Sequence, residues 1–161
     1  MPGAITARWS KRWRANDLQA QALTVAFTGP ADDRMAIRDL YDSYADGIVR
    51  MDRATWLECW CNDAAWHTHE YFSVTGREAI GGKFDELMAD VALATFFTQV
   101  CAIEVDGVHA TARALCMERL VLAGGGGYQL TGRFEDRLRR DAGAWRFERR
   151  DYDVVTKEAT E

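Results

Sequence analysis

The second half of the chain is a succession of strand patterns separated by short turns, and this limits the fold more than any other feature. Runs rich in β-branched and aromatic residues begin near residue 93 and are broken at Asp106-Gly107, at 124–127 and at Ala142-Gly143. Asp-Gly and other glycine-containing turns are typical of connections between antiparallel strands. The pattern therefore predicts a meander of long antiparallel strands.

The segments before this meander have helical periodicity. In "DDRMAIRDLYDSYADGIVRMD" apolar residues recur at helical spacing, and Asp32 or Asp33 is suited to the N-cap. "ATWLECWC" repeats the pattern, and "TGREAIGGKFDELM" predicts a third helix with Thr75 and Glu78 spaced as a capping box. Helices followed by strands indicate an α+β domain, with helices on one face of a bent antiparallel sheet.

Residues 1–30 differ from the rest and are expected to form an N-terminal arm ahead of one domain over 31–161. The segment "NDLQAQALTVAF" in this arm predicts a short helix that ends at Gly29-Pro30. The arm also has a basic cluster with two tryptophans one turn apart: Arg8, Trp9, Lys11, Arg12, Trp13 and Arg14. Such an arm could bind a membrane surface or a partner, or pack on the domain or on a neighbouring subunit.

The charge balance argues against nucleic acid as a partner. The 161 residues carry a net charge of -5, and no basic face interleaved with aromatic residues is present in the domain. No apolar run approaches the length of a membrane span, and the N-terminus lacks the apolar centre of a secretory signal. Four cysteines without a framework spacing predict reduced thiols and a cytoplasmic protein.

The stretch "AAWHTHEYF", residues 64–72, predicts an aromatic-rich strand with two histidines. His67 and His69 lie two residues apart and so share a face, which is how a strand can present a metal pair. Cys59 and Cys61 are near, but they fall on a predicted helix, where residues two apart point in different directions. No third potential ligand lies at a spacing typical of metal sites. We therefore expect both histidines to point away from the interior and the protein to bind no metal.

The same alternation places Trp66 and Thr68 on the opposite, interior face of this strand. The Thr68 hydroxyl could orient a ligand or be a satisfied core group. A β-bulge between Trp66 and His69 would invert part of the register and turn a histidine inward, where His67 could act as a base.

The strand "YQLTGRFEDRL" carries a carboxylate on a face that is otherwise mostly apolar. Tyr128, Phe134 and Asp136 belong to this face, and the alternate residues are polar. A buried carboxylate is costly unless paired, and an unpaired one has a raised pKa suited to proton transfer. Asp136 is therefore either an acid/base group or one half of a structural ion pair with Arg150.

Tyr44, in the apolar stripe of the first helix, needs a hydrogen-bond partner if it is buried.

Together these segments resemble the SnoaL-like branch of the nuclear-transport-factor-2-like superfamily. The resemblance covers residues 32–155 and rests on "AIRDLYDSYADGIVRMD", "CWCNDAAW", Gly76 and "GRFEDRLRRDAGAWRFERR" in that order. It implies a cone-shaped bent sheet wrapped around helices, a cystatin-like roll, with a mostly apolar pocket. Relatives include polyketide cyclases, ketosteroid isomerase, scytalone dehydratase and hexachlorocyclohexane dehydrochlorinase. They also include the small subunits of ring-hydroxylating dioxygenases, whose role is largely structural.

The resemblance also implies pocket positions. Tyr44 matches the oxyanion-binding tyrosine of ketosteroid isomerase, and Thr68 falls where that enzyme has its general-base aspartate. Trp66 and Arg150 match pocket residues of the dehydrochlorinase.

The dehydratase and the dehydrochlorinase share a helix aspartate and a strand histidine, where this chain has Val49 and Phe96.

The resemblance implies a cofactor-free cyclase, isomerase or dehydratase that acts by proton transfer on a hydrophobic carbonyl or polyketide-like substrate. The alternative is a non-catalytic ligand-binding or assembly subunit. We also expect the protein to form a homodimer or homotrimer. The expected catalytic residues are Asp136, Tyr44, Arg150 and, through a bulge, His67; the expected substrate-binding residues are Trp66, Thr68, Phe96, Val49, Tyr128 and Phe134.

Overall fold

The computed structural model describes residues 26–69 and 71–161. The basic cluster and the short helix predicted in the N-terminal arm lie outside these residues, apart from the end of the helix segment. The helices of the described part are α1 (Ala31–Val49), α2 (Arg53–Glu58) and α3 (Arg77–Met88). Its strands are β1 (Phe27–Thr28), β2 (Trp60–Thr68), β3 (Phe72–Thr75), β4 (Val91–Asp106), β5 (His109–Leu122), β6 (Gly127–Asp141) and β7 (Ala144–Thr160).

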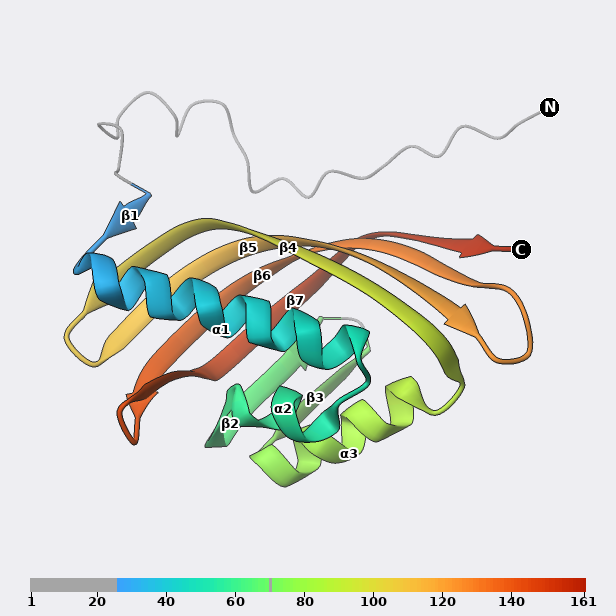
Figure 1. Ribbon diagram of the computed structural model, residues 1–161, viewed down its shortest axis with the longest axis horizontal. Coiled ribbons are helices and arrows are strands. Elements are labelled where there is room, and N and C mark those ends of the chain that lie inside the picture. The colour runs from blue at the N-terminus through green and yellow to red at the C-terminus, as the bar shows by residue number, and fades with distance from the viewer. Residues whose placement is uncertain (1–25, 70) are drawn as a thin grey trace.

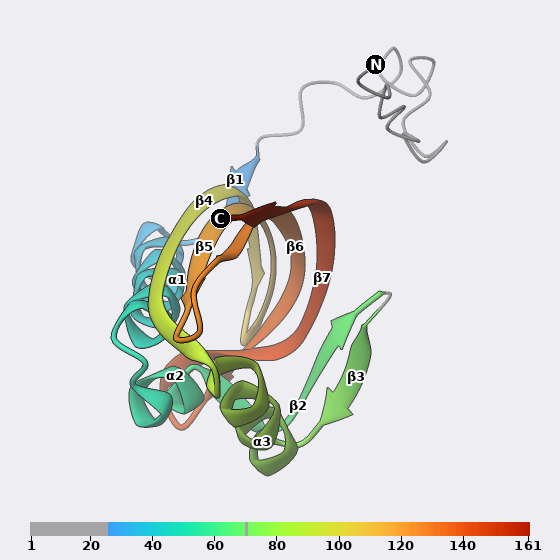
Figure 2. The same cartoon turned by 90° about the vertical axis from the view of Figure 1, so that its right-hand side faces the viewer.

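The strands form one strongly curved, unclosed sheet in the order β1-β4-β5-β6-β7-β2-β3. Strands β4 to β7 are the predicted antiparallel meander. The sheet arches over α1, while α2, α3 and the β2–β3 hairpin close the opposite side (Figures 1 and 2). The predicted α+β cone is therefore confirmed.

The sheet is mixed and not wholly antiparallel as expected. Strand β1 runs parallel to β4, and β2 runs parallel to β7. The second pairing arises because the chain enters β2 beside the start of β7, where the Phe147 N–H donates to the Cys59 carbonyl at 2.8 Å. That pairing also ends α2 at Glu58, three residues before the end of the helical pattern. Trp60 and Cys61, predicted as helical, belong to β2.

Two predicted helix caps are absent. The N-cap of α1 is Pro30, without a side-chain hydrogen bond, and Asp32 and Asp33 lie in the first turn instead. Negative charge there is favourable because of the helix dipole. The capping box predicted at Thr75 does not form, because Gly76 is the N-cap of α3, with a φ of 90° that favours glycine.

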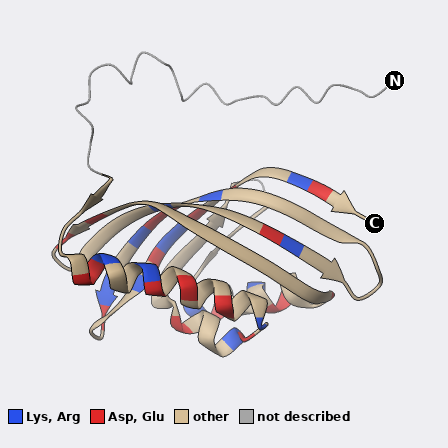
Figure 3. Ribbon diagram, turned by 45° about the horizontal axis from the view of Figure 1, so that its top comes forward, with Lys and Arg blue, Asp and Glu red and all other residues tan. Residues whose placement is uncertain are grey.

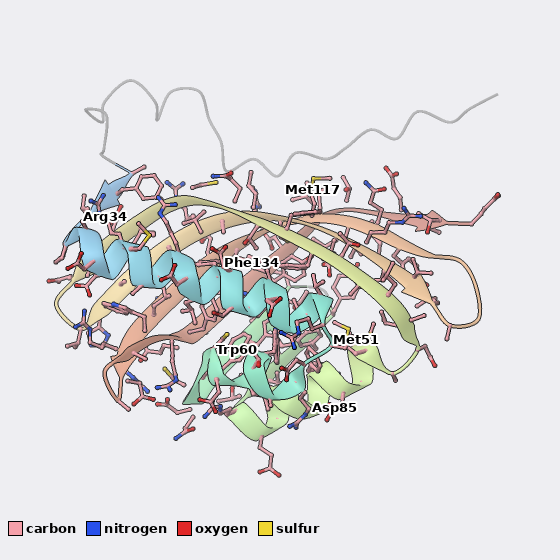
Figure 4. The ribbon with its side chains drawn as sticks, in the orientation of Figure 1. Arg34, Met51, Trp60, Asp85, Met117 and Phe134 are labelled. Atoms are coloured by element: carbon pink, nitrogen blue, oxygen red, sulfur yellow. The ribbon has the colours of Figure 1, made fainter. Side chains whose placement is uncertain are left out.

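The meander strands alternate between an inner and an outer face. Along β5 the inner residues from Ala110 to Cys116 are buried and their neighbours are exposed. Charged residues are spread along α1 and along the strands of the sheet (Figure 3). Trp60 lies on the helix side of the sheet and Met117 on its outer side (Figure 4). The core thus occupies the inside of the cone.

Candidate active site

The inside of the cone contains a mostly apolar cavity of about 360 Å³. Helices α1, α2 and α3 form one side of it, and strands β2 to β7 form the other. Its wall is rich in aromatic rings, including Trp56 from α2, Phe72 from β3 and Phe84 from α3. Ligand pockets commonly have volumes of about 300–1,000 Å³, so this cavity suits a compact molecule.

Six of the predicted site residues line this cavity: Tyr44, Trp66, Thr68, Phe96, Tyr128 and Phe134. Four others do not: Val49, His67, Asp136 and Arg150. Val49 is 42% exposed because it is one helical step from Ile48, the last inward residue of α1. Its predicted contact with substrate therefore has no support in the geometry.

Asp136 and Arg150 form the buried ion pair that was one of the two alternatives for this carboxylate. The Arg150 guanidinium donates to Asp136 through Nε at 2.9 Å and Nη2 at 2.8 Å. The Tyr41 hydroxyl donates to the same carboxylate, and Arg150 is 0% exposed. Three donors thus occupy the carboxylate of Asp136 away from the cavity, and the geometry favours a structural role over an acid/base role.

Tyr44 connects this ion pair to the cavity. Its ring lies 4.3 Å from the Arg150 guanidinium carbon and 5.8 Å, centroid to centroid, from Phe96. Tyr44 lines the cavity, and because the Arg150 guanidinium can only donate a hydrogen bond to its hydroxyl, the hydroxyl proton is available to a ligand. Burial raises its pKa above the ordinary value of 10, although the charge of Arg150 opposes this shift. The hydroxyl therefore keeps its proton at neutral pH.

Glu118 is an ionisable residue of the cavity that the sequence interpretation missed. It lies on β5 and lines the cavity, and the Tyr152 hydroxyl donates to its Oε1 at 2.6 Å. Burial raises the pKa of Glu118 above its ordinary value of 4.5, although the hydrogen bond from Tyr152 and the charge of Lys157 oppose this shift. A buried carboxylate with a raised pKa is a candidate general base.

The alternation along β5 could have identified this residue. Ala110, Ala112, Ala114 and Cys116 are the inner, buried residues, and the next inward position is Glu118. The period-2 hydrophobic pattern was weak, because the buried face of "HATARALCMERL" consists of alanines and a cysteine and has no large apolar residues.

A close approach between β6 and β7 places the Tyr152 ring. A Cβ added at Gly132 would lie 2.2 Å from Cε2 of Tyr152 and 2.9 Å from its hydroxyl oxygen. Phe134 packs on the same ring, with centroids 4.9 Å apart. Only the absence of a side chain at Gly132 lets the Tyr152 ring reach Glu118 in this position.

The histidines lie outside the cavity. β2 pairs continuously with β3 and β7 from Ala65 to Thr68, so no bulge turns His67 inward. His67 is half-buried and its ring lies 5.0 Å from that of His69. The His69 side chain is 62% exposed, with Nε2 3.5 Å from Asp153. Over residues 26–69 and 71–161 no group of three or more His, Cys, Asp or Glu is placed to hold a metal ion.

Two further observations concern the cysteines and membrane-spanning segments. Cys59, Cys61, Cys101 and Cys116 are all free thiols in the structure. In the described part of the chain, no helix is long and apolar enough to cross a membrane.

The structure is a small α+β cone that encloses a mostly apolar cavity with ionisable groups on its wall. Residues 30–151 match the model of the SnoaL-like domain family. The chain therefore belongs to the SnoaL-like family of the nuclear-transport-factor-2-like superfamily, as its segments predicted. No curated protein matches the sequence.

Similar solved structures support the fold. A candidate aromatic ring hydroxylase from Novosphingobium aromaticivorans is 22% identical, with a TM-score of 0.77 over 83% of this chain and 96% of that one. A candidate scytalone dehydratase from the same organism is 17% identical, with a TM-score of 0.74 over 79% and 87%. A hexachlorocyclohexane dehydrochlorinase from Novosphingobium barchaimii is 16% identical, with a TM-score of 0.71 over 80% and 90%. At these identities the likeness establishes the fold alone.

Proposed function

We propose that the protein is a cofactor-free lyase or isomerase that transfers a proton on a compact hydrophobic carbonyl compound in the cavity. The observation that carries this proposal is the position of Glu118, a carboxylate on the mostly apolar wall of the cavity, where burial raises its pKa. The related cyclases, isomerases and dehydratases named above make proton transfer the natural class of reaction. The acid/base role expected of Asp136 moves to Glu118, because Asp136 is held by three donors outside the cavity.

The reaction would begin with Glu118 in its ionised form. Its carboxylate removes a proton from the carbon next to the carbonyl, and the electron pair of that C–H bond moves to the carbonyl oxygen as an enolate. The Tyr44 hydroxyl donates a hydrogen bond to this oxygen and stabilises its negative charge. The protonated Glu118 then returns the proton to another carbon in an isomerisation, or to a leaving hydroxyl group in a dehydration.

The remaining cavity residues would hold and shield the substrate. Trp66 and Phe96 supply apolar walls that exclude water, and a dry site strengthens the hydrogen bond from Tyr44. The Asp136–Arg150 pair supports the Tyr44 ring from outside the cavity. In this proposal Arg150 acts on the substrate through Tyr44 and not by contact.

The experiment measures deuterium incorporation into 2-tetralone, a bicyclic ketone with acidic protons next to its carbonyl. The wild-type protein should accelerate exchange, and Glu118→Gln should reduce the protein-catalysed rate by about 10²-fold or more. Glu86→Gln is the matched control, since Glu86 also lines the cavity but is exposed on α3. Full exchange by a folded Glu118→Gln variant, or binding of 2-tetralone without any exchange, would refute the proposal.

The second candidate is a non-catalytic assembly subunit, and the outer face of the sheet favours it. Phe97 is 67% exposed there, and the neighbouring Leu115 and Met117 are exposed as well. We expect this apolar surface to be covered in a homodimer or homotrimer of a cytoplasmic protein. Native mass spectrometry of material purified from its source would distinguish the two. A homo-oligomer supports the enzyme, whereas a stoichiometric foreign subunit supports assembly.

A further inference from the structure

Four cavity residues form one row across the inner face of the sheet. Phe96 on β4 pairs with Glu118 on β5, Glu118 pairs with Leu130 on β6, and Leu130 pairs with Lys157 on β7. Directly paired residues project to the same side of a sheet. All four line the cavity. Lys157 is therefore an exposed cation on the inner face of the sheet, at a mostly apolar cavity.

The row also sets how far Lys157 lies from the proposed base. Adjacent strands are about 4.8 Å apart, so the backbones of Glu118 and Lys157 are separated by about 10 Å. At this separation the positive charge of Lys157 lowers the pKa of Glu118. A compact molecule can touch both groups at once.

Aromatic rings hold the Lys157 ammonium group at the cavity. Its Nζ lies 4.3 Å from the ring centroid of Tyr128 and 5.8 Å from that of Tyr71, and both tyrosines line the cavity. Lys83 also lines the cavity but forms an ion pair with Glu86. Among the described residues no carboxylate forms an ion pair with Lys157. The ammonium charge of Lys157 is therefore available to bind a ligand.

We propose that Lys157 binds an anionic oxygen group of the substrate, so that the substrate is a compact hydrophobic anion whose reacting carbon lies between Lys157 and Glu118. The proton transfer at Glu118 rests on the function proposed above; the anion site rests on the row and on the two tyrosines. The anionic group is either a carboxylate of the substrate itself or a phosphate of a thioester-linked carrier. Both present oxyanions that an ammonium group binds.

Binding titrations with three probes of one ring system test this proposal. The probes are 2-naphthoate, 2-naphthoyl-coenzyme A and the neutral methyl 2-naphthoate. Lys157→Gln should weaken the binding of at least one anionic probe about tenfold, because a charge-assisted hydrogen bond is lost, and leave the ester unchanged. Lys157→Arg should retain most of the affinity, and Lys83→Gln is the matched control that should bind all three like the wild type.

The outcomes separate the sources of the anion. A loss confined to 2-naphthoate identifies a free carboxylate, and a loss confined to the thioester identifies a carrier phosphate. Equal effects of Lys157→Gln on the ester and on both anions, or no effect on any probe, would overturn the proposal.

The same titrations with Glu118→Gln keep this inference distinct from the proposed reaction. Removing the Glu118 charge removes repulsion from a bound anion, so Glu118→Gln should bind the preferred anionic probe more tightly than the wild type. Its preference for anion over ester should still depend on Lys157. If exchange of 2-tetralone fails while this dependence holds, the reaction is wrong and the anion site is right.

Discussion

Asp136→Asn should destabilise the fold strongly, because it removes one charge of an ion pair that has no access to water. The side chains of Asp136 and Arg150 are both 0% exposed, and the carboxylate accepts from Tyr41 as well as twice from Arg150. Asparagine has nearly the same shape but keeps only one acceptor oxygen and turns N–H donors toward the guanidinium. The Arg150 charge would then be buried without compensation.

The expected loss is about 3–5 kcal/mol of the free energy of unfolding, the usual cost of breaking a buried pair from one side. Globular domains have about 5–15 kcal/mol in total, so the variant would be marginal. In a domain of this size each kcal/mol lowers Tm by about 2–4 °C, which gives a fall of about 6–20 °C. Urea unfolding followed by circular dichroism measures the free energy directly.

Two further variants make this test specific. Asp151→Asn breaks the pair that Arg149 and Asp151 form on the exposed side of β7, and it should cost about 1 kcal/mol or less. Asp136→Leu combined with Arg150→Met removes both charges and should recover most of the loss. If Asp136→Asn is no less stable than Asp151→Asn, the pair is not the structural element inferred here.

Further predictions concern the base, its neighbours and the histidines. Gly132→Ala should push the Tyr152 ring off Glu118, and Tyr152→Phe should remove the same hydrogen bond without moving the ring. Since that bond lowers the pKa of Glu118, both variants should shift the pH profile of 2-tetralone exchange to higher pH; an unshifted profile would show that the bond is unimportant. The raised pKa means that the folded state holds this proton more tightly than the unfolded state. Urea unfolding should therefore show the wild type losing stability relative to Glu118→Gln as pH rises from about 4.5 through the raised pKa, whereas parallel curves would contradict the shift. Replacing both His67 and His69 with Gln should change neither exchange nor, beyond about 0.5 kcal/mol, stability; a folded but inactive double variant would support a histidine base.

Periodicity predicted much of the fold and part of the site. Helical spacing placed Tyr44 inside, and strand alternation placed Trp66 and Thr68 inside, because each rule follows from local backbone geometry. The start of β2 at Trp60 was not predictable in this way, since pairing with a strand more than eighty residues later overrides the local helical pattern.

The chemistry of the site depended on contacts between distant segments. Alternation placed Asp136 inside but left open whether it pairs with Arg150 or acts as an acid/base group, because only the register of β6 with β7 sets the two residues side by side. Glu118 was missed because its strand buries alanines, which carry little hydrophobic signal. Its partner Tyr152 reaches it over Gly132, a contact across three strands that spacing along the chain does not encode.

The most direct test of the proposed base is the pKa of Glu118 itself. A ¹³C NMR titration of protein labelled at the glutamate carboxyl carbons gives this value, and the signal absent from Glu118→Gln assigns it. A titration midpoint clearly above the ordinary 4.5, moving higher still in Tyr152→Phe, is the predicted result. A midpoint at or below 4.5 would mean that Glu118 is an ordinary solvated carboxylate and that the cavity has no base at this position.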